Sequence, residues 1–485
     1  MIASMEPIIL TGEDLRIADV VSVARDGRPV RLSDGAVERM RGARAVVAGM
    51  IASGQSVYGL TTGVGALREV AQDPADAERY NHLTIQAHCT AHGPPLPDAV
   101  VRAAMAHRAN AFARGRAMVR PEVAQAYVDA LNDGVTPLVH SIGSVGQSDL
   151  PAMAEIARGL LDRGLRLQQG EALALLNANS LSVGHGALAL ADARNLLDAL
   201  DVVAALSIEG FAANPSVLHP DIAAARPYRG LGDTIARLRE LLAGSYIWQP
   251  GSARQLQDPL SFRSIPQIHG AARDAFGFAE AQLQIELNSS GDNPMLVPLE
   301  ERFISVGNFD ITPVAAAIDF ARIALGQLLT SACERVQKHL AQHFSGIATG
   351  LRAVEGPDDA LALIGGGAAA LAAEARLLAG PVSLDLPTST IAAGIEDHMT
   401  MAPLGVRRLA EMVSLGSRLA AVELVVAAQA VDLRGVRPLG RGTAIAHART
   451  RELISFVGPG QAPSNDLDAL AEWVGAGMPV GPTGV

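Results

Sequence analysis

The stretch TPVAAAIDFARIALGQLLTSACERVQKHLAQH, from Thr312 to His343, decides the fold. Its apolar residues recur at i, i+3, i+4 and i+7, which predicts an amphipathic helix longer than the usual length of about a dozen residues. Gly270–Leu287 and Val406–Leu433 show the same spacing. Helices of this length must bury broad apolar faces against one another. The sequence therefore predicts an all-α fold with a long central helical bundle.

The composition of the chain agrees with helices packed around a sizeable core. The 485 residues are 49% hydrophobic but only 4% aromatic. Alanine and leucine carry the apolar content, which favours helices over sheets. The net charge of −11 argues against a nucleic-acid surface, because phosphate binding needs clustered Lys and Arg.

Several features of the sequence predict a cytoplasmic location. The two cysteines, Cys89 and Cys333, are too few for a disulfide framework and fit a reducing compartment. The start, MIASMEPIILTGEDL, lacks a basic region followed by a long apolar run, so we expect no signal peptide. The most apolar stretches, such as Ala315–Leu329, are too short or too charged to span a bilayer. We expect neither a membrane nor a nucleic acid as a partner.

Local signals place loops and helix ends along the first half of the chain. Ser33 and Asp34 suit the N-cap of a helix over Gly35–Ser53. YGLTTGVGALREV, Tyr58–Val70, contains three glycines and a threonine pair, which indicates a loop. A second irregular segment ends in GSVGQSDLP, Gly143–Pro151, and a helical pattern follows it.

Common kinds of site do not fit this sequence. GQSDL fails the last position of the G-x-S-x-G nucleophile elbow. GVGALRE lacks the Lys-Ser/Thr ending of a phosphate-binding loop. His88 and His92 are four residues apart, but no acidic third ligand follows at a typical spacing. We therefore expect no metal site.

Eight segments, taken in order, carry a resemblance that covers nearly the whole chain. They are YGLTTGVG, IQAHCTAHGPPL, GSVGQSDLP, EALALLNANS, QDPLSFRSIPQIHGA, ELNSSGDNP, VGNFD and LPTSTIAAGIEDHMTM. Together they resemble the histidine and aromatic amino-acid ammonia-lyase family. The resemblance implies a carbon–nitrogen lyase with a small-molecule substrate, in a homotetramer whose subunits share active sites. We expect an N-terminal helical domain over 1–200, with the tyrosine and cofactor loops, and a central bundle with C-terminal helices over 201–485.

The cofactor loop departs from the family pattern. In the family, an internal Ala-Ser-Gly cyclises to the electrophile methylidene-imidazolone when the glycine nitrogen attacks the alanine carbonyl. Here Gln147 replaces the alanine, and Asp149 follows Ser148 directly because the glycine is missing. A side chain on the attacking amide and a shortened loop should block ring closure, since glycine allows the close approach. Leu260 also replaces a tyrosine that works beside the electrophile in the family. We therefore expect no such prosthetic group and no other cofactor.

Other positions keep the residue types of the family. Tyr58 matches the family's base. Arg263 matches the residue that grips the substrate carboxylate, a task that suits the planar guanidinium. The remaining polar groups that match the pocket are Asn177, Gln257 and Asn308.

Two further positions indicate that the ring of the substrate is an imidazole. His88 and Glu396 fall where histidine-specific members carry His and Glu, which can hydrogen-bond an imidazole. Phe309 and Glu396 are candidates for holding a cation, and Glu396 is a second candidate for the proton acceptor. Each residue alone has an ordinary structural explanation, so only the ordered set points to a site.

Three functions remain open at the level of sequence. The first is a lyase without the electrophile that releases an amine, foremost trimethylamine, from a histidine-derived betaine such as ergothioneine or hercynine. This variant resembles the ergothionase branch of the family. The second is an ordinary histidine ammonia-lyase that still cyclises its atypical loop. The third is an inactive relative kept as a scaffold or binding protein, although such a protein would more naturally have lost Tyr58 or Arg263.

Overall fold

The computed structural model describes residues 6–353, 360–384, 391–461 and 466–478, which form two compact units. The LPTST part of the last family-like segment, residues 386–390, lies outside the described residues. The expected division of the chain after residue 200 stays a prediction. Unit 1 comprises Met1–Ala191, Ala279–Ile318 and Pro381–Arg407, and unit 2 comprises Asp192–Phe278, Asp319–Gly380 and Arg408–Val485.

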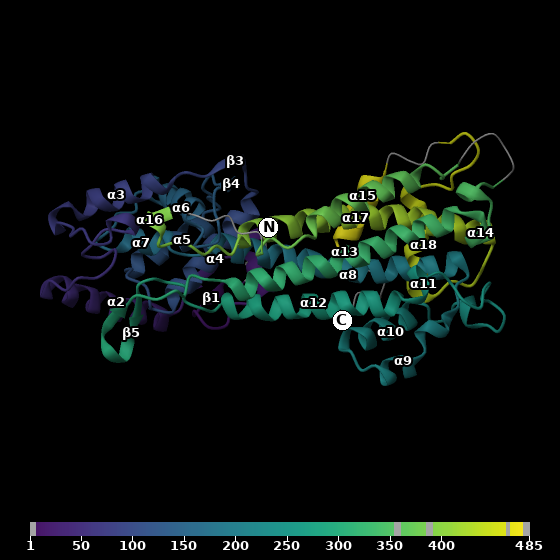
Figure 1. The fold of residues 1–485 in the computed structure, drawn as a ribbon, viewed down its shortest axis with the longest axis horizontal. Helices are drawn as coiled ribbons and strands as arrows, with labels where there is room; N and C mark the ends of the chain where they lie inside the picture. Colours follow the sequence, from purple (N-terminus) through teal and green to yellow (C-terminus); the bar gives the residue numbers. More distant parts are fainter. Residues whose placement is uncertain (1–5, 354–359, 385–390, 462–465, 479–485) are drawn as a thin grey trace. The chain divides into compact units, whose positions relative to one another are not determined.

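Unit 2 is built from long helices (Figure 1). It contains most of α8 (Ser180–Phe211), α12 (Ile265–Glu286), α13 (Thr312–Leu340) and α17 (Ala402–Arg434). These bounds confirm the three long helices expected from the apolar spacing, except that α13 ends at Leu340. The shorter helices of the unit are α9 (Pro220–Ala225), α10 (Arg229–Leu241), α11 (Leu260–Arg263), α14 (Gln342–Ser345), α15 (Ile364–Leu378), α18 (Arg441–Leu453) and α19 (Leu467–Gly475).

A glycine lets three of these helices meet closely. A Cβ on Gly416 of α17 would lie 2.6 Å from the side chain of Leu196 in α8 and 3.1 Å from that of Leu329 in α13. Both leucines are fully buried, and burying one such side chain stabilises a fold by roughly 1.5–3 kcal/mol. The bundle therefore rests on apolar faces that the sequence pattern already marks.

Unit 1 packs shorter helices around α4 (Asp98–Ala113). Every α4 residue from Val100 to Ala113 is buried, and α1 and α5 pack against this helix. Ser33 caps α2 as expected, because its Oγ accepts a hydrogen bond from the N–H of Ala36 at 3.1 Å. The other bounds are α1 (Ile17–Arg25), α2 (Asp34–Ser53), α3 (Ala77–His88), α5 (Pro121–Asn132), α6 (Leu150–Asp162), α7 (Glu171–Leu176) and α16 (Ile391–Gly394).

In the described part of unit 1, three small sheets depart from an entirely helical body. Each has two strands of three or four residues, so the fold class remains helical. The pairs are parallel β1 (Ile8–Leu10) with β2 (Val30–Leu32), antiparallel β3 (His92–Pro95) with β4 (His140–Ile142), and antiparallel β5 (Met295–Val297) with β6 (Arg302–Ile304).

Among the residues that the structure describes, two helical segments are long and apolar enough to cross a membrane. They are Glu171–Phe211 and Thr312–Leu340, and the second extends the Ala315–Leu329 stretch that we expected to be too short or too charged. Their most apolar windows are 94% and 67% buried inside the protein. This burial is typical of core helices, which need the same hydropathy to pack against one another.

Candidate active site

Tyr58 lies in the loop that follows α2, as the sequence predicts. Its hydroxyl accepts a hydrogen bond from the N–H of Gly65 at 3.0 Å, and its side chain is half-buried. Gly59 has φ +65°, and a Cβ there would collide with Leu173 of α7. The loop therefore needs a glycine beside the tyrosine. Burial raises the pKa of Tyr58 above its usual value; the Gly65 N–H lowers it, while the charge of Glu396 raises it.

The segment that carries Glu396 packs against the tyrosine loop. The turn Gly65–Leu67 contacts α16, where a Cβ on Gly65 would lie 3.5 Å from Ala392. Glu396 lies two residues after the end of α16 and is half-buried. Burial raises the pKa of the Glu396 carboxyl, whereas the charge of His88 lowers it. The base candidate and the two imidazole-contact candidates therefore act on one another electrostatically within unit 1.

His88 is the last residue of α3 and is oriented by its own helix. Its Nδ1 lies 2.7 Å from the carbonyl oxygen of Thr84. A carbonyl only accepts, so Nδ1 carries the proton and donates. In the neutral ring Nε2 is then an acceptor, suited to the N–H of another imidazole.

The GSVGQSDLP loop is buried and held by several contacts. Ser148 has φ +59° and is 2% exposed, and its Oγ donates to Oδ1 of Asn177 at 2.5 Å. Asn177 in turn donates from Nδ2 to the carbonyl of Asn293 at 2.8 Å. A left-handed backbone is unusual for a residue other than glycine, and these contacts hold it in place.

Asp149 joins this loop to the start of α8. Its backbone N–H donates to the carbonyl of Ala178 at 2.8 Å. Its carboxylate accepts from the N–H of Ser182 at 2.8 Å and from the Ser182 hydroxyl at 3.0 Å. It thus satisfies donors of the first helical turn, where a negative charge is favoured. Burial raises the pKa of Asp149 to about 7, although the hydrogen bonds from Ser182 and from the N–H of Leu181 lower it.

A second set of contacts ties the loop to the Glu396 segment. The hydroxyl of Thr400 donates to the carbonyl of Gly146 at 3.0 Å, and the N–H of Met401 donates to the carbonyl of Val145 at 2.9 Å. These two bonds join residues more than 250 positions apart in the sequence. The loop and the segment that carries Glu396 are therefore one connected piece of unit 1.

Sequence reasoning missed two polar residues of this piece. Asp310 accepts from Nε2 of Gln147 at 3.5 Å and lies 3.4 Å from Nε2 of His398. Both residues stand in quoted segments, VGNFD and LPTSTIAAGIEDHMTM. Their position inside two of the family-like segments was the only signal that could have pointed to them. Nothing in the local sequence indicated that the two side chains lie close together.

Asn308 and Phe309 lie on a neighbouring turn, nearer the surface. Asn308 is exposed and donates from Nδ2 to the sulfur of Met295 at 3.3 Å. Phe309 is half-buried, and its carbonyl accepts from the Asn179 side chain. The backbone of Gln147 bridges that of Asp310, which follows Phe309 directly.

Unit 2 carries the other two candidates, which lie together on and beside α11. Arg263 and Gln257 are both exposed, and Nη1 of Arg263 donates to Oε1 of Gln257. Leu260, at the position of the family's second tyrosine, is 64% exposed. The turn therefore presents a guanidinium, an amide and an apolar side chain to the outside of the chain.

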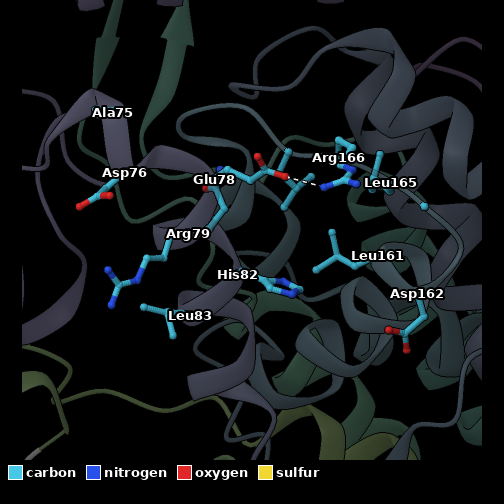
Figure 2. Close-up of a pocket in the computed structure, with 13 residues that line it drawn as sticks. Ala75, Asp76, Glu78, Arg79, His82, Leu83, Leu161, Asp162, Leu165 and Arg166 are labelled. Atoms are coloured by element: carbon cyan, nitrogen blue, oxygen red, sulfur yellow. Dashed lines mark hydrogen bonds and ion pairs between the residues drawn. The ribbon is translucent and has the colours of Figure 1, made fainter.

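Two of the cavities on the described part of unit 1 are not lined by Tyr58, His88 or Glu396. The larger, of about 760 Å³, lies beside α3; Figure 2 shows its residues, with Arg166 paired to Glu78 at 2.8 Å. The smaller, of about 570 Å³, includes Asn308. The described residues contain no group of three or more His, Cys, Asp or Glu side chains placed to hold a metal ion.

Comparison with known proteins identifies the family. A family model described as aromatic amino acid lyase matches residues 15–165 and 163–452. The chain belongs to the aromatic amino acid lyase family.

Individual relatives agree with this membership over the full length. The histidine ammonia-lyase of Treponema denticola is 34% identical over 490 residues, which cover 96% of each chain. That of Anaeromyxobacter dehalogenans is 35% identical over 508 residues, covering 98% of this chain and 99% of the relative. This lyase therefore acts on a carbon–nitrogen bond.

A solved structure is similar over nearly the whole lyase. It is ergothionase, the ergothioneine-degrading enzyme of Treponema denticola, in complex with desmethyl-ergothioneine sulfonic acid. The TM-score is 0.91 at 29% sequence identity, with 97% of this chain and 99% of that chain covered.

Proposed function

We propose that this lyase eliminates trimethylamine from a histidine-derived betaine such as ergothioneine or hercynine, and yields a urocanate-type or thiourocanate-type product. Tyr58 is the base, and Arg263 with Gln257 binds the carboxylate. His88 and Glu396 bind the imidazole, and Asn177 and Asn308 are polar groups of the pocket. Phe309, together with Glu396, is the candidate for holding the cation. No methylidene-imidazolone takes part.

The anchoring of Asp149 is the observation that carries the proposal. In the family the nitrogen after the serine attacks a carbonyl two residues earlier. Here that nitrogen belongs to Asp149 and donates to the carbonyl of Ala178. The Asp149 carboxylate is in turn bound to the first turn of α8. This arrangement does not fit ring closure, because the attack would require Asp149 to release those partners at the start of α8.

The chemistry of a betaine removes the need for the electrophile. A free α-amine is a poor leaving group, so ordinary members attach it to the electrophile first. A trimethylated nitrogen has no lone pair for such an attack and already carries a positive charge. When the base takes the β-proton, the C–H electron pair forms the Cα=Cβ bond. The C–N pair then leaves on nitrogen as neutral trimethylamine.

The electrostatics of Tyr58 support a cationic substrate. Burial and Glu396 raise its pKa, so the phenolate is disfavoured in the free enzyme, although Arg68 opposes this. A quaternary ammonium keeps its charge at every pH and favours a phenolate close to it. The substrate would thus promote ionisation of its own base.

The similarity to ergothionase supports the betaine over free histidine, because that structure holds an ergothioneine derivative. The names of the sequence relatives favour the second candidate, an ordinary histidine ammonia-lyase. That candidate needs ring closure through Asp149, which the anchored geometry opposes. An inactive scaffold has no comparable support.

The proposal includes a cytoplasmic homotetramer in which neighbouring subunits share active sites. Arg263 and Gln257 are both exposed on their turn, so the proposed carboxylate clamp is open to completion by a neighbouring subunit. Light scattering after size-exclusion chromatography measures the subunit number. A monomeric enzyme with full activity would contradict the shared sites.

An ultraviolet assay with ergothioneine, hercynine and histidine tests the reaction. Trimethylamine and ammonia are measured separately in each mixture. We expect an absorbing product with equimolar trimethylamine from a betaine, and no ammonia from histidine. Ammonia from histidine would favour the second candidate, and no turnover of any of the three would favour the third.

A further inference from the structure

The α11 turn that carries Arg263 has one buried face. Ser261 and Phe262 are 9% and 1% exposed, whereas Leu260 and Arg263 point outward. The turn ends at Ser264, whose φ of −104° and ψ of 15° are not helical. At this break the Ser261 carbonyl needs a partner from outside the helix ladder.

Two contacts hold the residues before and within α11. The ring of Phe262 stacks on Phe211 with centroids 4.1 Å apart, and His339 meets both rings edge-on. On the N-terminal side, Asp258 accepts from the N–H of Asn214 at 2.6 Å. The stack and the hydrogen bond anchor the segment before and within α11, but neither reaches the Ser261 carbonyl.

A buried ion pair reaches that carbonyl. Arg335 of α13 and Glu423 of α17 are both 0% exposed and form a bidentate pair, with Nε–Oε1 at 2.6 Å and Nη2–Oε2 at 3.0 Å. The third nitrogen of Arg335, Nη1, donates to the Ser261 carbonyl at 3.4 Å and to the Ser331 hydroxyl at 3.3 Å. That hydroxyl also donates to the Ser261 carbonyl, at 3.4 Å.

A helical bundle does not in general require a buried ion pair of this kind. Removing two charges from water is costly, and apolar side chains of similar volume often replace a buried pair without loss of stability. Apolar side chains could not donate to the Ser261 carbonyl. The planar guanidinium can, because it binds Glu423 with two nitrogens and keeps a third for the carbonyl.

We propose that Arg335 and Glu423 are positioning residues for Arg263, and act through the carbonyl of Ser261 two residues before it. The inference rests on the proposed role of Arg263 as the carboxylate clamp. It assigns to the ion pair a part in substrate recognition, although neither side chain is exposed to a substrate.

The test compares two double variants of the whole enzyme. Arg335→Met with Glu423→Leu removes both charges, so no unpaired charge remains buried. The matched control is Arg322→Met with Asp319→Leu. That pair is also buried in α13, and its arginine donates to the carbonyl of Leu378 in α15 instead.

Hydrogen exchange tests the positioning without any need for activity. We expect the peptide over residues 255–264 to exchange faster in the Arg335/Glu423 variant than in the wild type, and unchanged in the control. Equal exchange in all three proteins would overturn the proposal. If the double variant does not fold, Arg335→Lys keeps the charge beside Glu423, loses the planar fork, and should show the same faster exchange.

Ligand binding tests the consequence for recognition. Calorimetry compares imidazole-propanoate with an alkylimidazole that lacks the carboxylate. The preference for the carboxylate is the ratio of the affinities for these two ligands. We expect this ratio to fall about tenfold or more in the Arg335/Glu423 variant and to stay unchanged in the control. Adding Arg263→Lys to the variant should cause little further loss of this preference. The effects of the substitutions are not additive when the ion pair acts through Arg263. An unchanged preference would also overturn the proposal.

The outcome separates this inference from the proposed function. A wild-type enzyme with no preference for the carboxylate would refute the clamp, while the exchange result would still decide whether the ion pair orders the turn. A wild-type preference that survives in the variant would refute the inference alone.

Discussion

The backbone N–H of Asp149 donates to the carbonyl of Ala178 at 2.8 Å, in the turn just before α8. This bond occupies the nitrogen that family members use to close their prosthetic ring. The purified enzyme should therefore have the mass of its unmodified sequence. Intact-mass spectrometry measures this, with Ser148→Ala as a control that lacks the hydroxyl needed for dehydration. A wild type lighter by two water molecules would contradict the proposal.

Stability should depend on pH through Asp149. The pKa is about 7 in the fold because of burial and about 3.9 in an unfolded chain. The native state then binds more protons between these values, so the free energy of unfolding falls as pH rises from about 4 to about 7. Asp149→Asn should remove a slope of up to ~1.4 kcal/mol per pH unit.

Urea unfolding at several pH values in this range measures that slope. The exposed Asp162 offers a matched control, since Asp162→Asn changes the same chemical group on the surface. A slope that is the same in Asp149→Asn and in the wild type would show that Asp149 is already ionised in the fold.

Tyr58→Phe should abolish most of the elimination. The substitution keeps the ring and removes the hydroxyl that accepts from Gly65, so binding should change little while the rate falls by the ~10²–10⁴-fold typical of a lost general base. Because burial raises the pKa of Tyr58, the wild-type kcat/KM should rise toward alkaline pH, and this rise should vanish in the variant.

Single-turnover kinetics with a β-deuterated betaine measure this step. Tyr80, in α3, raises the pKa of Tyr58 through its charge. Tyr80→Phe removes this second phenol and should lower the rate far less. Near-wild-type turnover by Tyr58→Phe would instead assign the proton transfer to another group, foremost Glu396.

Glu396→Gln should weaken imidazole binding more than it slows the chemistry. The amide keeps an acceptor but loses the charge that acts on His88 and Tyr58. A comparison of kcat and KM with the wild type separates the two effects. A loss of kcat as large as that of Tyr58→Phe would place Glu396 in proton transfer.

Arg263→Lys should raise KM and lower kcat together. A point charge replaces a planar fork, so the carboxylate loses its two-point contact and its orientation. Steady-state kinetics with the best betaine measure both constants. Unchanged affinity for the carboxylate would mean that Arg263 has a structural role instead.

The amino-acid sequence by itself determined the helices and the order of the site segments. The apolar spacing of α12, α13 and α17, the cap at Ser33 and the glycine-rich loop after α2 are local signals, and each matches the structure. The loss of glycine before Asp149 is also visible in the sequence. These features lie within a few residues of one another, so they need no knowledge of the fold.

Only the tertiary structure decided which distant residues meet. That Asp149 caps α8, that Asp310 joins Gln147 to His398, and that Arg335 reaches the carbonyl of Ser261 all depend on the path of the chain. The short strand pairs depend on the path of the chain too, since strands of three or four residues carry too little periodicity to be recognised. The neighbours of a side chain that lie 30 or more positions away follow from how helices pack. Apolar spacing marks which face of a helix packs, but not which residues that face meets.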